Sequence, residues 1–252
     1  MSLPKVGLCG VTGRMGQAIV ACLAAKKSPL ELGLGLSRHS DVSIADFFTH
    51  SDVVIDFTTP EACEAHLMAA VNHLKPIVVG ITGLSHHHHA LFEKAAHSIP
   101  IVYARNTSVG VLILSALVEK AAHLLKSKNP DTDVFEIHHH HKKDAPSGTA
   151  NHLAEAVLKG RGEAFKKIPW YDPFVTEGER PHNKIGIAAL RSGKRPGEHT
   201  VHFSWGAEVL SLGHTATDRT VFAEGAIQAA AWVVGQKPGL YTMADVLGLK
   251  EL

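Results

Sequence analysis

The chain has 252 residues, of which 45% are hydrophobic and 19% are charged, and its formal net charge is +1. This composition is typical of a globular protein with a sizeable core, and the absence of a basic block argues against nucleic acid or a membrane as partner. No apolar run reaches the length of a membrane span, and the N-terminus enters a strand directly rather than a signal peptide. The cysteines, Cys9, Cys22 and Cys63, lack C-x-x-C spacing, so we expect reduced thiols and a cytoplasmic protein.

A glycine-rich turn follows the first predicted strand, residues 3–9. It reads Gly10-Val11-Thr12-Gly13-Arg14-Met15-Gly16, and a helix is expected from about Met15 to Lys26. Glycines permit a tight turn and let backbone N–H groups approach a pyrophosphate at a helix N-terminus. A glycine triplet alone is a weak signal, but a strand before it and a helix after it are the context of a dinucleotide site. The turn therefore predicts a dinucleotide cofactor, with an ordinary strand–helix turn as the alternative.

The second predicted strand, residues 30–36, ends in Ser37-Arg38. An acidic residue at this point would hold the ribose 2′-hydroxyl of NAD. Here no carboxylate is present to repel a 2′-phosphate, and Arg38 can pair with one. The pair predicts a preference for NADPH over NADH, although Arg38 could be only a loop charge.

Apolar strands and helices continue to alternate, which predicts a doubly wound parallel sheet of the Rossmann type. Strands are expected at 52–57 and 100–104, and a strand followed by a glycine turn at 76–83. Thr59 is expected to cap one helix, and a long helix is expected to end near Lys126. Loops at the carboxyl ends of such strands line the cofactor crevice. The residues expected there are Phe57, Thr58, Gly80, Ile81, Thr82, Ala104, Arg105, Asn106 and Thr107.

After Lys126 the pattern changes to a second, α+β domain. A strand at 133–137 and a helix at 149–158 precede a polar excursion at 159–183. Strands expected at 185–190, 198–205 and 208–215 are separated by short turns, which indicates a mostly antiparallel sheet. The apolar helix at 219–234 could complete the first domain or pack in an interface, and a short closing helix is expected at 238–249.

A basic, histidine-rich stretch runs from His138 to Ala150, between that strand and a helix with Ser147 as its N-cap. Imidazoles, an ammonium group and helix-start N–H groups suit an anionic substrate that must also receive a proton. A solvated loop is the plain alternative. A metal site is disfavoured because consecutive histidines on a strand point to opposite faces and no ligand at suitable spacing joins them. A second run, His86 to His89, is expected on a solvent-facing helix.

Several stretches together resemble the 4-hydroxy-tetrahydrodipicolinate (dihydrodipicolinate) reductase family, over nearly the whole chain. The stretches that carry the resemblance are Gly10 to Gly16, Ile55 to Glu61, Asn106 to Val111, His138 to Ala150, Gly197 to Thr200 and Arg219 to Ala226. The His-His-x-His-Lys-x-Asp-Ala-Pro-Ser-Gly-Thr-Ala pattern is very specific, whereas the glycine turn is not. The resemblance implies NAD(P)H-dependent reduction of a cyclic imine, the product of dihydrodipicolinate synthase, to tetrahydrodipicolinate on the diaminopimelate route to lysine.

The resemblance also implies residue roles. His138 would be the proton donor and acceptor, Lys142 a second proton donor, and His139 a substrate contact. A substrate carboxylate would bind Ser147, Gly148 and Thr149. The pyrophosphate would bind Gly10, Val11, Thr12, Gly13, Arg14 and Met15, the adenosine end Ser37 and Arg38, and the nicotinamide end 80–82 and 104–107. No metal is implied. A dinucleotide domain, 1–108 with 219–252, and a substrate domain, 109–218, are expected, with four substrate-domain sheets forming a homotetramer.

The chain departs from the family pattern at a few positions. The segment between Arg38 and Asp52 is short, Ser37 replaces an acidic residue, and Ile81 stands where threonine is common. Arg105 lies where a small residue is frequent, and we have no physical account of that change. A non-catalytic NADP-binding sensor, a His-rich metal-binding protein and a dehydrogenase of another small imine or amino acid are the competing functions.

Overall fold

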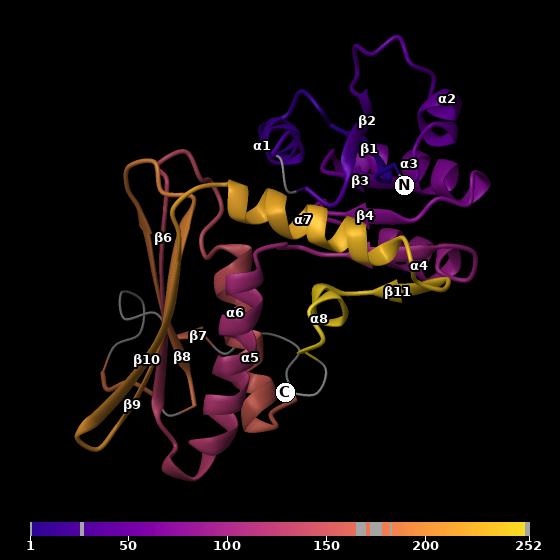
Figure 1. Ribbon diagram of the computed structural model, residues 1–252. Coiled ribbons are helices and arrows are strands. Elements are labelled where there is room, and N and C mark those ends of the chain that lie inside the picture. Colours follow the sequence, from indigo (N-terminus) through magenta and orange to yellow (C-terminus); the bar gives the residue numbers. More distant parts are fainter. Residues whose placement is uncertain (1, 26–27, 165–169, 172–177, 182, 250–252) are drawn as a thin grey trace. The chain divides into compact units, whose positions relative to one another are not determined.

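The computed structural model describes residues 2–25, 28–164, 170–171, 178–181 and 183–249. The chain forms two compact units. Unit 1 comprises Met1–Val109 and Arg219–Leu252, and unit 2 comprises Gly110–Asp218 (Figure 1). Much of the polar excursion expected at 159–183 lies outside the described residues. None of the helices in the described part of the chain is long and apolar enough to cross a membrane.

Unit 1 is built on a parallel sheet of six strands in the order β11-β5-β4-β3-β1-β2. Its strands are β1 (Lys5–Cys9), β2 (Glu31–Leu36), β3 (Val53–Asp56), β4 (Ile77–Val79), β5 (Pro100–Tyr103) and β11 (Gly239–Tyr241). Every residue of β3 and β4 is buried, as expected for strands covered on both faces. The predicted doubly wound parallel sheet is confirmed.

The helices of unit 1 are α1 (Arg14–Leu23), α2 (Ile44–Thr49), α3 (Pro60–Asn72), α4 (His86–Ala95), α7 (Thr220–Val233) and α8 (Met243–Val246). The apolar helix α7, whose destination the sequence left open, packs against α1 and strands β3, β4 and β5 (Figure 1). Gly225 lets α7 lie close to the segment after β5, since a Cβ there would be 1.8 Å from the carbonyl oxygen of Thr107.

The expected closing helix at 238–249 is wrong in its first part. Gly239–Tyr241 forms β11, which pairs in parallel with Pro100–Val102 at the edge of the sheet. The helix begins only at Met243, after Thr242 and Asp245 form a capping box. Pairing with an open sheet edge depends on a strand distant in sequence, so local helical periodicity missed it.

Unit 2 contains a five-stranded sheet in the order β10-β9-β6-β8-β7. Its elements are α5 (Val109–Leu124), the 3₁₀ turn η1 (Lys126–Lys128), β6 (Asp131–His138), α6 (Gly148–Arg161), β7 (Trp170–Tyr171), β8 (Ile185–Arg191), β9 (Gly197–Trp205) and β10 (Glu208–Ala216). The β10–β9 and β9–β6 pairs are antiparallel, and the β6–β8 and β8–β7 pairs are parallel. The sheet is therefore mixed, with two antiparallel and two parallel pairs, rather than mostly antiparallel as expected. Strands β8 and β9 follow one another in sequence but lie on either side of β6, so β6 is parallel to one and antiparallel to the other.

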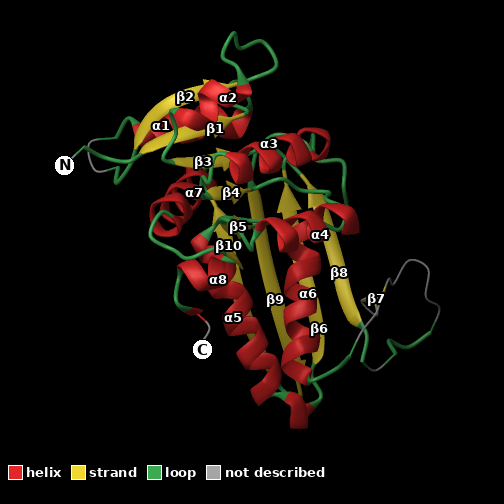
Figure 2. Cartoon of the chain, turned by 90° about the vertical axis from the view of Figure 1, so that its right-hand side faces the viewer, coloured by secondary structure: helices red, strands yellow, loops and turns green. Residues whose placement is uncertain are grey.

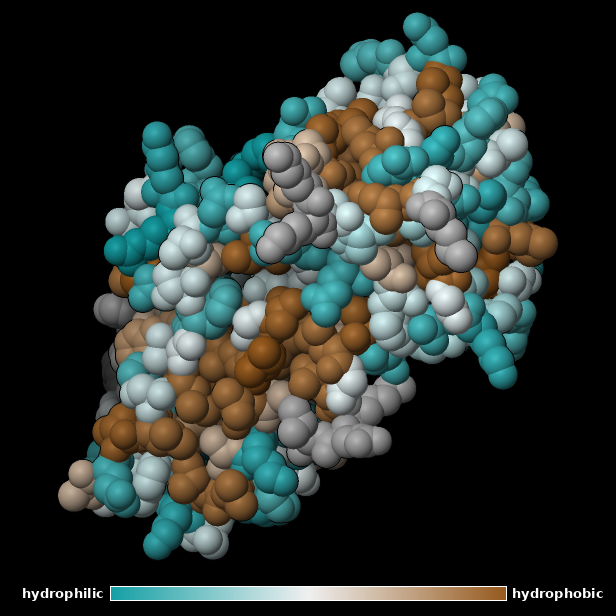
Figure 3. Space-filling view, viewed as in Figure 1, coloured by the Kyte–Doolittle hydropathy of each residue, from teal (hydrophilic) through white to brown (hydrophobic). Residues whose placement is uncertain are grey.

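Helices α5 and α6 lie side by side on one face of this sheet (Figure 2). The opposite face presents apolar side chains to solvent: Phe135 is 47% exposed, Leu190 58% and Val209 62%. Helix α5 is also partly apolar on its outer side, where Leu117 and Leu124 are exposed. Figure 3 shows apolar side chains gathered over the region where Figure 1 places α5.

Candidate active-site elements

The glycine turn closes tightly over the end of β1. Gly10 has φ +82°, and its N–H donates to the carbonyl oxygen of Leu36 at 2.8 Å. A Cβ on Gly16 would lie 2.2 Å from the carbonyl oxygen of Gly10, so only glycine allows α1 to start this close to the turn. Gly13 is the N-cap of α1. Thr12, Gly13 and Arg14 are exposed and Met15 is half-buried, at the end of a helix where N–H groups bind anions.

Ser37 and Arg38 follow β2 next to this turn. The N–H of Ser37 donates to the hydroxyl of Ser40 at 2.9 Å, and the two hydroxyls lie 3.0 Å apart. This local network holds Ser37 in a fixed turn while the Arg38 side chain is exposed. The turn therefore offers a hydroxyl and a guanidinium, donors that suit a phosphate.

The other expected cofactor loops differ in exposure. Phe57 packs over Gly80, where a Cβ would lie 2.3 Å from the phenyl ring. Ile81 and Ala104 are buried, whereas Thr82 and Arg105 are exposed. Two further residues of these loops form structural bonds: Asn106 accepts from the N–H of Ser108 at 2.8 Å, and the hydroxyl of Thr107 donates to the carbonyl oxygen of Phe222 at 2.7 Å.

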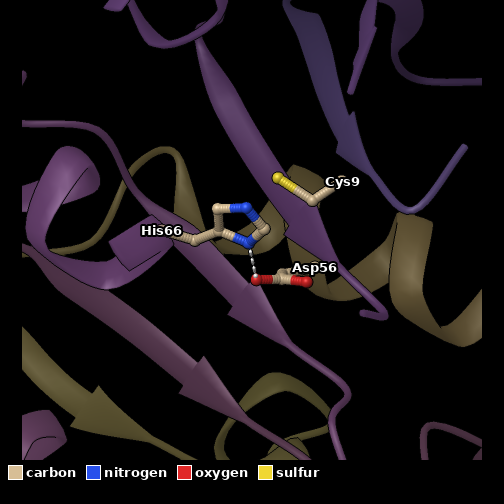
Figure 4. A group of neighbouring side chains, drawn as sticks. All are labelled: Cys9, Asp56 and His66. Carbon is tan, nitrogen blue, oxygen red and sulfur yellow. Dashed lines mark hydrogen bonds and ion pairs between the residues drawn. The ribbon is translucent and has the colours of Figure 1, made fainter. Parts of the chain in front are cut away.

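Asp56, at the carboxyl end of β3, anchors the loop that carries Phe57. Its carboxylate accepts from the N–H of Thr58 at 2.9 Å, the hydroxyl of Thr58 at 2.6 Å and Nδ1 of His66 at 2.8 Å (Figure 4). Asp56 is 1% exposed and His66 8%. Cys9 lies beside them, and burial, with the nearby Asp56 carboxylate, raises the pKa of its thiol well above the ordinary value. Sequence reasoning missed Asp56 and His66, which lie ten positions apart on a strand and a helix.

Glu136 and His138 lie on one face of β6, because alternate residues of a strand share a face. The imidazole Nδ1 of His138 donates to Oε2 of Glu136 in a short hydrogen bond. Arg191 on β8 donates to both carboxylate oxygens at 3.0 Å, and the N–H of Ser147 donates to Oε1 at 2.9 Å. Burial raises the pKa of Glu136, but the bonds from His138, Arg191 and Ser147 outweigh it and lower the pKa to about 2. Glu136 is therefore a buried carboxylate at neutral pH.

The N-terminus of α6 adjoins this carboxylate. Ser147 caps the helix as predicted, with its hydroxyl accepting from the N–H of Ala150 at 3.1 Å. The same hydroxyl lies 3.1 Å from Nε2 of His199. Burial, reinforced by the proximity of His138, lowers the pKa of His199 to about 3, so His199 is neutral and accepts the hydroxyl proton. Gly148 is exposed, and a Cβ there would meet nothing within 4 Å, so there is open space in front of the helix.

Lys142 lies in the loop between β6 and α6. Its Nζ is 2.9 Å from Oδ1 of Asp144, and its side chain is 21% exposed. Partial burial raises the pKa of Asp144, but the bond from Lys142 outweighs it and lowers the pKa. The loop is fixed at its start by the N–H of His139, which donates to the carbonyl oxygen of Arg195 at 2.9 Å. Lys142 and His139 are half-buried, so both reach the surface near a rigid strand end.

The structure thus brings His138 together with Ser147, through Glu136, and places Lys142 and His139 in the loop between them. Sequence reasoning missed Glu136, Arg191 and His199. The spacing Glu136-x-His138 within a strand was a usable signal for the first. Arg191 and His199 come from β8 and β9, and only the strand order brings them to β6.

Among the residues that the structure describes, two groups of side chains have metal-ligating chemistry. Cys9, Asp56 and His66 offer donor atoms within 4.8 Å of one another, as do Glu136, His138 and His199. In the first group the raised thiol pKa keeps Cys9 protonated, and in the second the Arg191 guanidinium already occupies both Glu136 oxygens. The Asp56–His66 pair of the first group and the Glu136–His138 pair of the second are also already bonded to each other. In the second histidine run, His88 accepts from the N–H of Ser85 at 3.2 Å and completes the cap of α4, while His86 and His87 are exposed.

Comparison with known proteins gives concordant matches. The family described as "Dihydrodipicolinate reductase, N-terminus" matches residues 4–107, and "Dihydrodipicolinate reductase, C-terminus" matches residues 110–247. The chain is 43% identical to a 4-hydroxy-tetrahydrodipicolinate reductase of Zymomonas mobilis, covering 97% of each chain. It is 40% identical to that of Pseudoalteromonas translucida, covering 99% of this chain and 100% of the other.

A solved structure agrees with these matches. The dipicolinate-bound dihydrodipicolinate reductase from Paenisporosarcina sp. TG-14 has a TM-score of 0.71 at 23% identity, covering 97% of this chain and 99% of the other. At that identity the likeness concerns the fold, and it holds over nearly the whole length of both chains.

Proposed function

The chain belongs to the dihydrodipicolinate reductase family, and from that premise we propose that it reduces 4-hydroxy-tetrahydrodipicolinate to tetrahydrodipicolinate with NAD(P)H, on the diaminopimelate route to lysine. The observation that carries the proposal is the cluster in unit 2. A buried Glu136–His138 pair adjoins the start of α6, and the N–H of Ser147 binds the same carboxylate. The Glu136 carboxylate is therefore bonded both to a proton donor, His138, and to the helix end that can bind an anion. Because its three cysteines form no disulfide, we also place the enzyme in the cytoplasm.

Unit 2 would bind the dicarboxylate substrate. Ser147, Gly148 and Thr149 lie at the N-terminus of α6, where backbone N–H groups and the helix dipole favour a carboxylate. The open space in front of Gly148 leaves room for that carboxylate. The exposed part of the Lys142 side chain and the half-buried His139 supply additional donors to an anion.

Two groups of the chain would supply the proton. A bound nicotinamide supplies the hydride that the imine accepts. Reduction leaves the product one proton short, and negative charge builds up on it during the transfer. The Lys142 ammonium, held by Asp144, and Nε2 of His138, whose Nδ1 is committed to Glu136, are the groups that can deliver it.

Unit 1 would hold the dinucleotide, and we propose a preference for NADPH. The fit rests on the glycine turn: Gly10 with φ +82° and the close approach at Gly16 leave the N-terminus of α1 accessible to a pyrophosphate. Arg38 is exposed beside Ser37, where it can pair with a 2′-phosphate. Phe57, Gly80, Ile81, Thr82, Ala104, Arg105, Asn106 and Thr107 would border the nicotinamide end, with Thr107 acting through its bond to α7.

We also propose a homotetramer formed through the outer face of the unit 2 sheet, which exposes Phe135, Leu190 and Val209. Light scattering after size-exclusion chromatography tests it. Phe135→Glu should yield smaller assemblies, while Leu117→Glu, a matched change on the exposed side of α5, should leave the mass unchanged. A monomeric wild-type protein, or dissociation by Leu117→Glu alone, would contradict this interface.

A coupled assay on untagged protein tests the activity. Dihydrodipicolinate synthase makes the substrate in place from pyruvate and aspartate semialdehyde, and nicotinamide oxidation is followed with NADPH and NADH in parallel. We expect synthase-dependent oxidation that is faster with NADPH. A protein that binds NADPH but oxidises neither cofactor would point to the sensor or to a different imine substrate.

A further inference from the structure

Glu136 is a strand carboxylate with three separate hydrogen-bonding partners. Its side chain is fully buried and is bonded to His138, to Arg191 through both oxygens, and to the N–H of Ser147. These partners come from the same strand, from β8 and from the start of α6. Two of the three, His138 and Ser147, belong to the proposed reaction, so one carboxylate fixes the proposed proton donor and the proposed carboxylate-binding helix end.

Arg191 extends the connection to Lys142. Its Nη2 donates to the carbonyl oxygen of Asp144 at 2.5 Å, and the Asp144 carboxylate binds Lys142 Nζ at 2.9 Å. A continuous chain of bonds therefore runs from Lys142 through Asp144, Arg191 and Glu136 to His138. Both proposed proton donors are connected to the same Glu136–Arg191 ion pair. The Glu136 side chain is 0% exposed and the Arg191 side chain 19%.

The Glu136 carboxylate also determines which imidazole nitrogen of His138 is available. A carboxylate only accepts hydrogen bonds, so Nδ1 of His138 carries a hydrogen in both charge states of the ring. The exchangeable proton is then confined to Nε2, which lies above Gly197, where a Cβ would be 3.0 Å away. The ring of neutral His199 stands edge-on to that of His138 with centroids 5.0 Å apart. Its neutrality avoids a second positive charge beside the proton donor.

We propose that Glu136 and Arg191 are positioning residues of the reaction: Glu136 holds His138 with Nδ1 protonated, and Arg191 links that carboxylate to the loop of Lys142. The proposal rests on the reductase function proposed above. Neither residue needs to touch the substrate, and their roles are carried by the bonds to His138, Ser147 and Asp144.

The first test uses Glu136→Gln, which keeps the shape of the side chain and removes its charge. A glutamine amide can donate to Nδ1, so the imidazole can adopt the tautomer with hydrogen on Nε2. We expect kcat to fall by about 10²-fold, the scale of acid–base catalysis, and KM for the substrate to rise because the N–H of Ser147 loses a charged acceptor. Glu136→Asp keeps the charge and should recover part of kcat.

The second measurement reads the tautomer itself. In ¹⁵N-labelled wild-type protein without substrate, we expect the neutral ring of His138 to carry its hydrogen on Nδ1, and we expect Glu136→Gln to change that pattern. Arg191→Lys should lower kcat less than Glu136→Gln. Glu119→Gln, which removes a surface ion pair with Lys159, is the matched control and should leave kcat, KM and the His138 signals unchanged.

The outcomes separate the two proposals. An inactive wild-type protein with a protonated Nδ1 on His138 would overturn the reductase function and leave the geometry intact. Active wild-type protein in which Glu136→Gln, folded by circular dichroism, keeps both its kcat and its His138 tautomer would overturn the positioning role. If Glu136→Gln fails to fold, Glu136→Asp and Arg191→Lys carry the same test.

Discussion

Unit 1 and unit 2 each contain a buried carboxylate at the carboxyl end of a central strand, bonded to a histidine and to a backbone N–H of the next segment. Asp56 binds His66 and the N–H of Thr58, and Glu136 binds His138 and the N–H of Ser147. The surroundings differ. Asp56 is bonded to a hydroxyl and lies near the Cys9 thiol, whereas Glu136 is bonded to a guanidinium through both oxygens.

The difference in surroundings indicates different roles. Asp56 holds a loop in place, and Glu136 belongs to the group of residues that we propose for proton transfer. At Asp56 the histidine is packed in helix α3 and the carboxylate orients the Phe57–Thr58 loop. At Glu136 the arginine compensates the carboxylate charge, and the histidine adjoins the open N-terminus of α6. We propose that the same local arrangement serves cofactor binding in unit 1 and proton transfer in unit 2. Changes on the two sides should affect different measurements.

The largest expected effect lies in unit 2. His138→Gln and Lys142→Ala should each lower kcat by about 10²–10⁴-fold, because each removes a proposed proton donor. The dissociation constant for NADPH, measured by fluorescence titration, should stay near the wild-type value since the glycine turn lies in unit 1. If either variant lost NADPH affinity as strongly as kcat, the assignment of cofactor binding to unit 1 and proton transfer to unit 2 would be wrong.

Acid stability should also depend on the unit 2 site. The folded-state pKa of Glu136 is lowered to about 2 and that of His199 to about 3. Both groups take up protons more readily when unfolded, so their contribution is complete above their ordinary pKa values and is lost as pH falls from about 6.5 toward 2. The free energy of unfolding falls by about 1.4 kcal/mol per pH unit for each group between its ordinary pKa and its folded-state pKa, which are 4.5 and about 2 for Glu136 and 6.5 and about 3 for His199.

Urea unfolding between pH 7 and pH 4 measures the His199 part of this loss. His199→Gln should flatten the pH dependence below pH 6.5, because the substituted side chain does not titrate. His39→Gln, at an exposed histidine of unit 1, is the control and should keep the wild-type slope. An unchanged slope in His199→Gln would mean that His199 does not titrate differently in the folded and unfolded protein.

A smaller effect is expected at Asp56. Asp56→Asn leaves the Thr58 and His66 donors without a charged acceptor in a buried site, which should cost about 1–3 kcal/mol of stability. The loosened loop should weaken NADPH binding while kcat at saturating cofactor changes less. Glu64→Gln, on the exposed side of the same helix as His66, is the control. A fall in kcat with unchanged NADPH affinity would contradict the anchoring role.

The smallest effect is expected at Ser37. Ser37→Asp places a carboxylate where a 2′-phosphate would lie, and a repulsion of about 1 kcal/mol would shift the ratio of kcat/KM values toward NADH by about fivefold. Ser40→Asp is less suited because it also removes the hydroxyl that holds the turn. If the ratio stays constant in Ser37→Asp, the assignment of Ser37 and Arg38 to the cofactor is wrong.

Features set by neighbouring residues could be predicted from the sequence. The glycine turn before α1, Thr59 at the start of α3 and Ser147 at the start of α6 all depend on residues within one turn of each other. The bond between Glu136 and Arg191 could not be predicted from the sequence, because Arg191 lies 55 positions away and approaches only through the pairing of β8 with β6. The destination of α7 was likewise open, because an apolar face does not specify which surface will cover it.

The return of the chain to unit 1 bears on how the protein is made. Unit 2 is an insertion, Gly110–Asp218, whose residues are all synthesised before those of α7 and β11. Domains generally fold as units during synthesis, N-terminal parts first. Here the N-terminal sheet must wait for the last residues to add its edge strand and to cover it with α7. The nascent chain therefore holds an incomplete sheet while the inserted unit can already fold, and chains truncated before Arg219 should expose that sheet to aggregation.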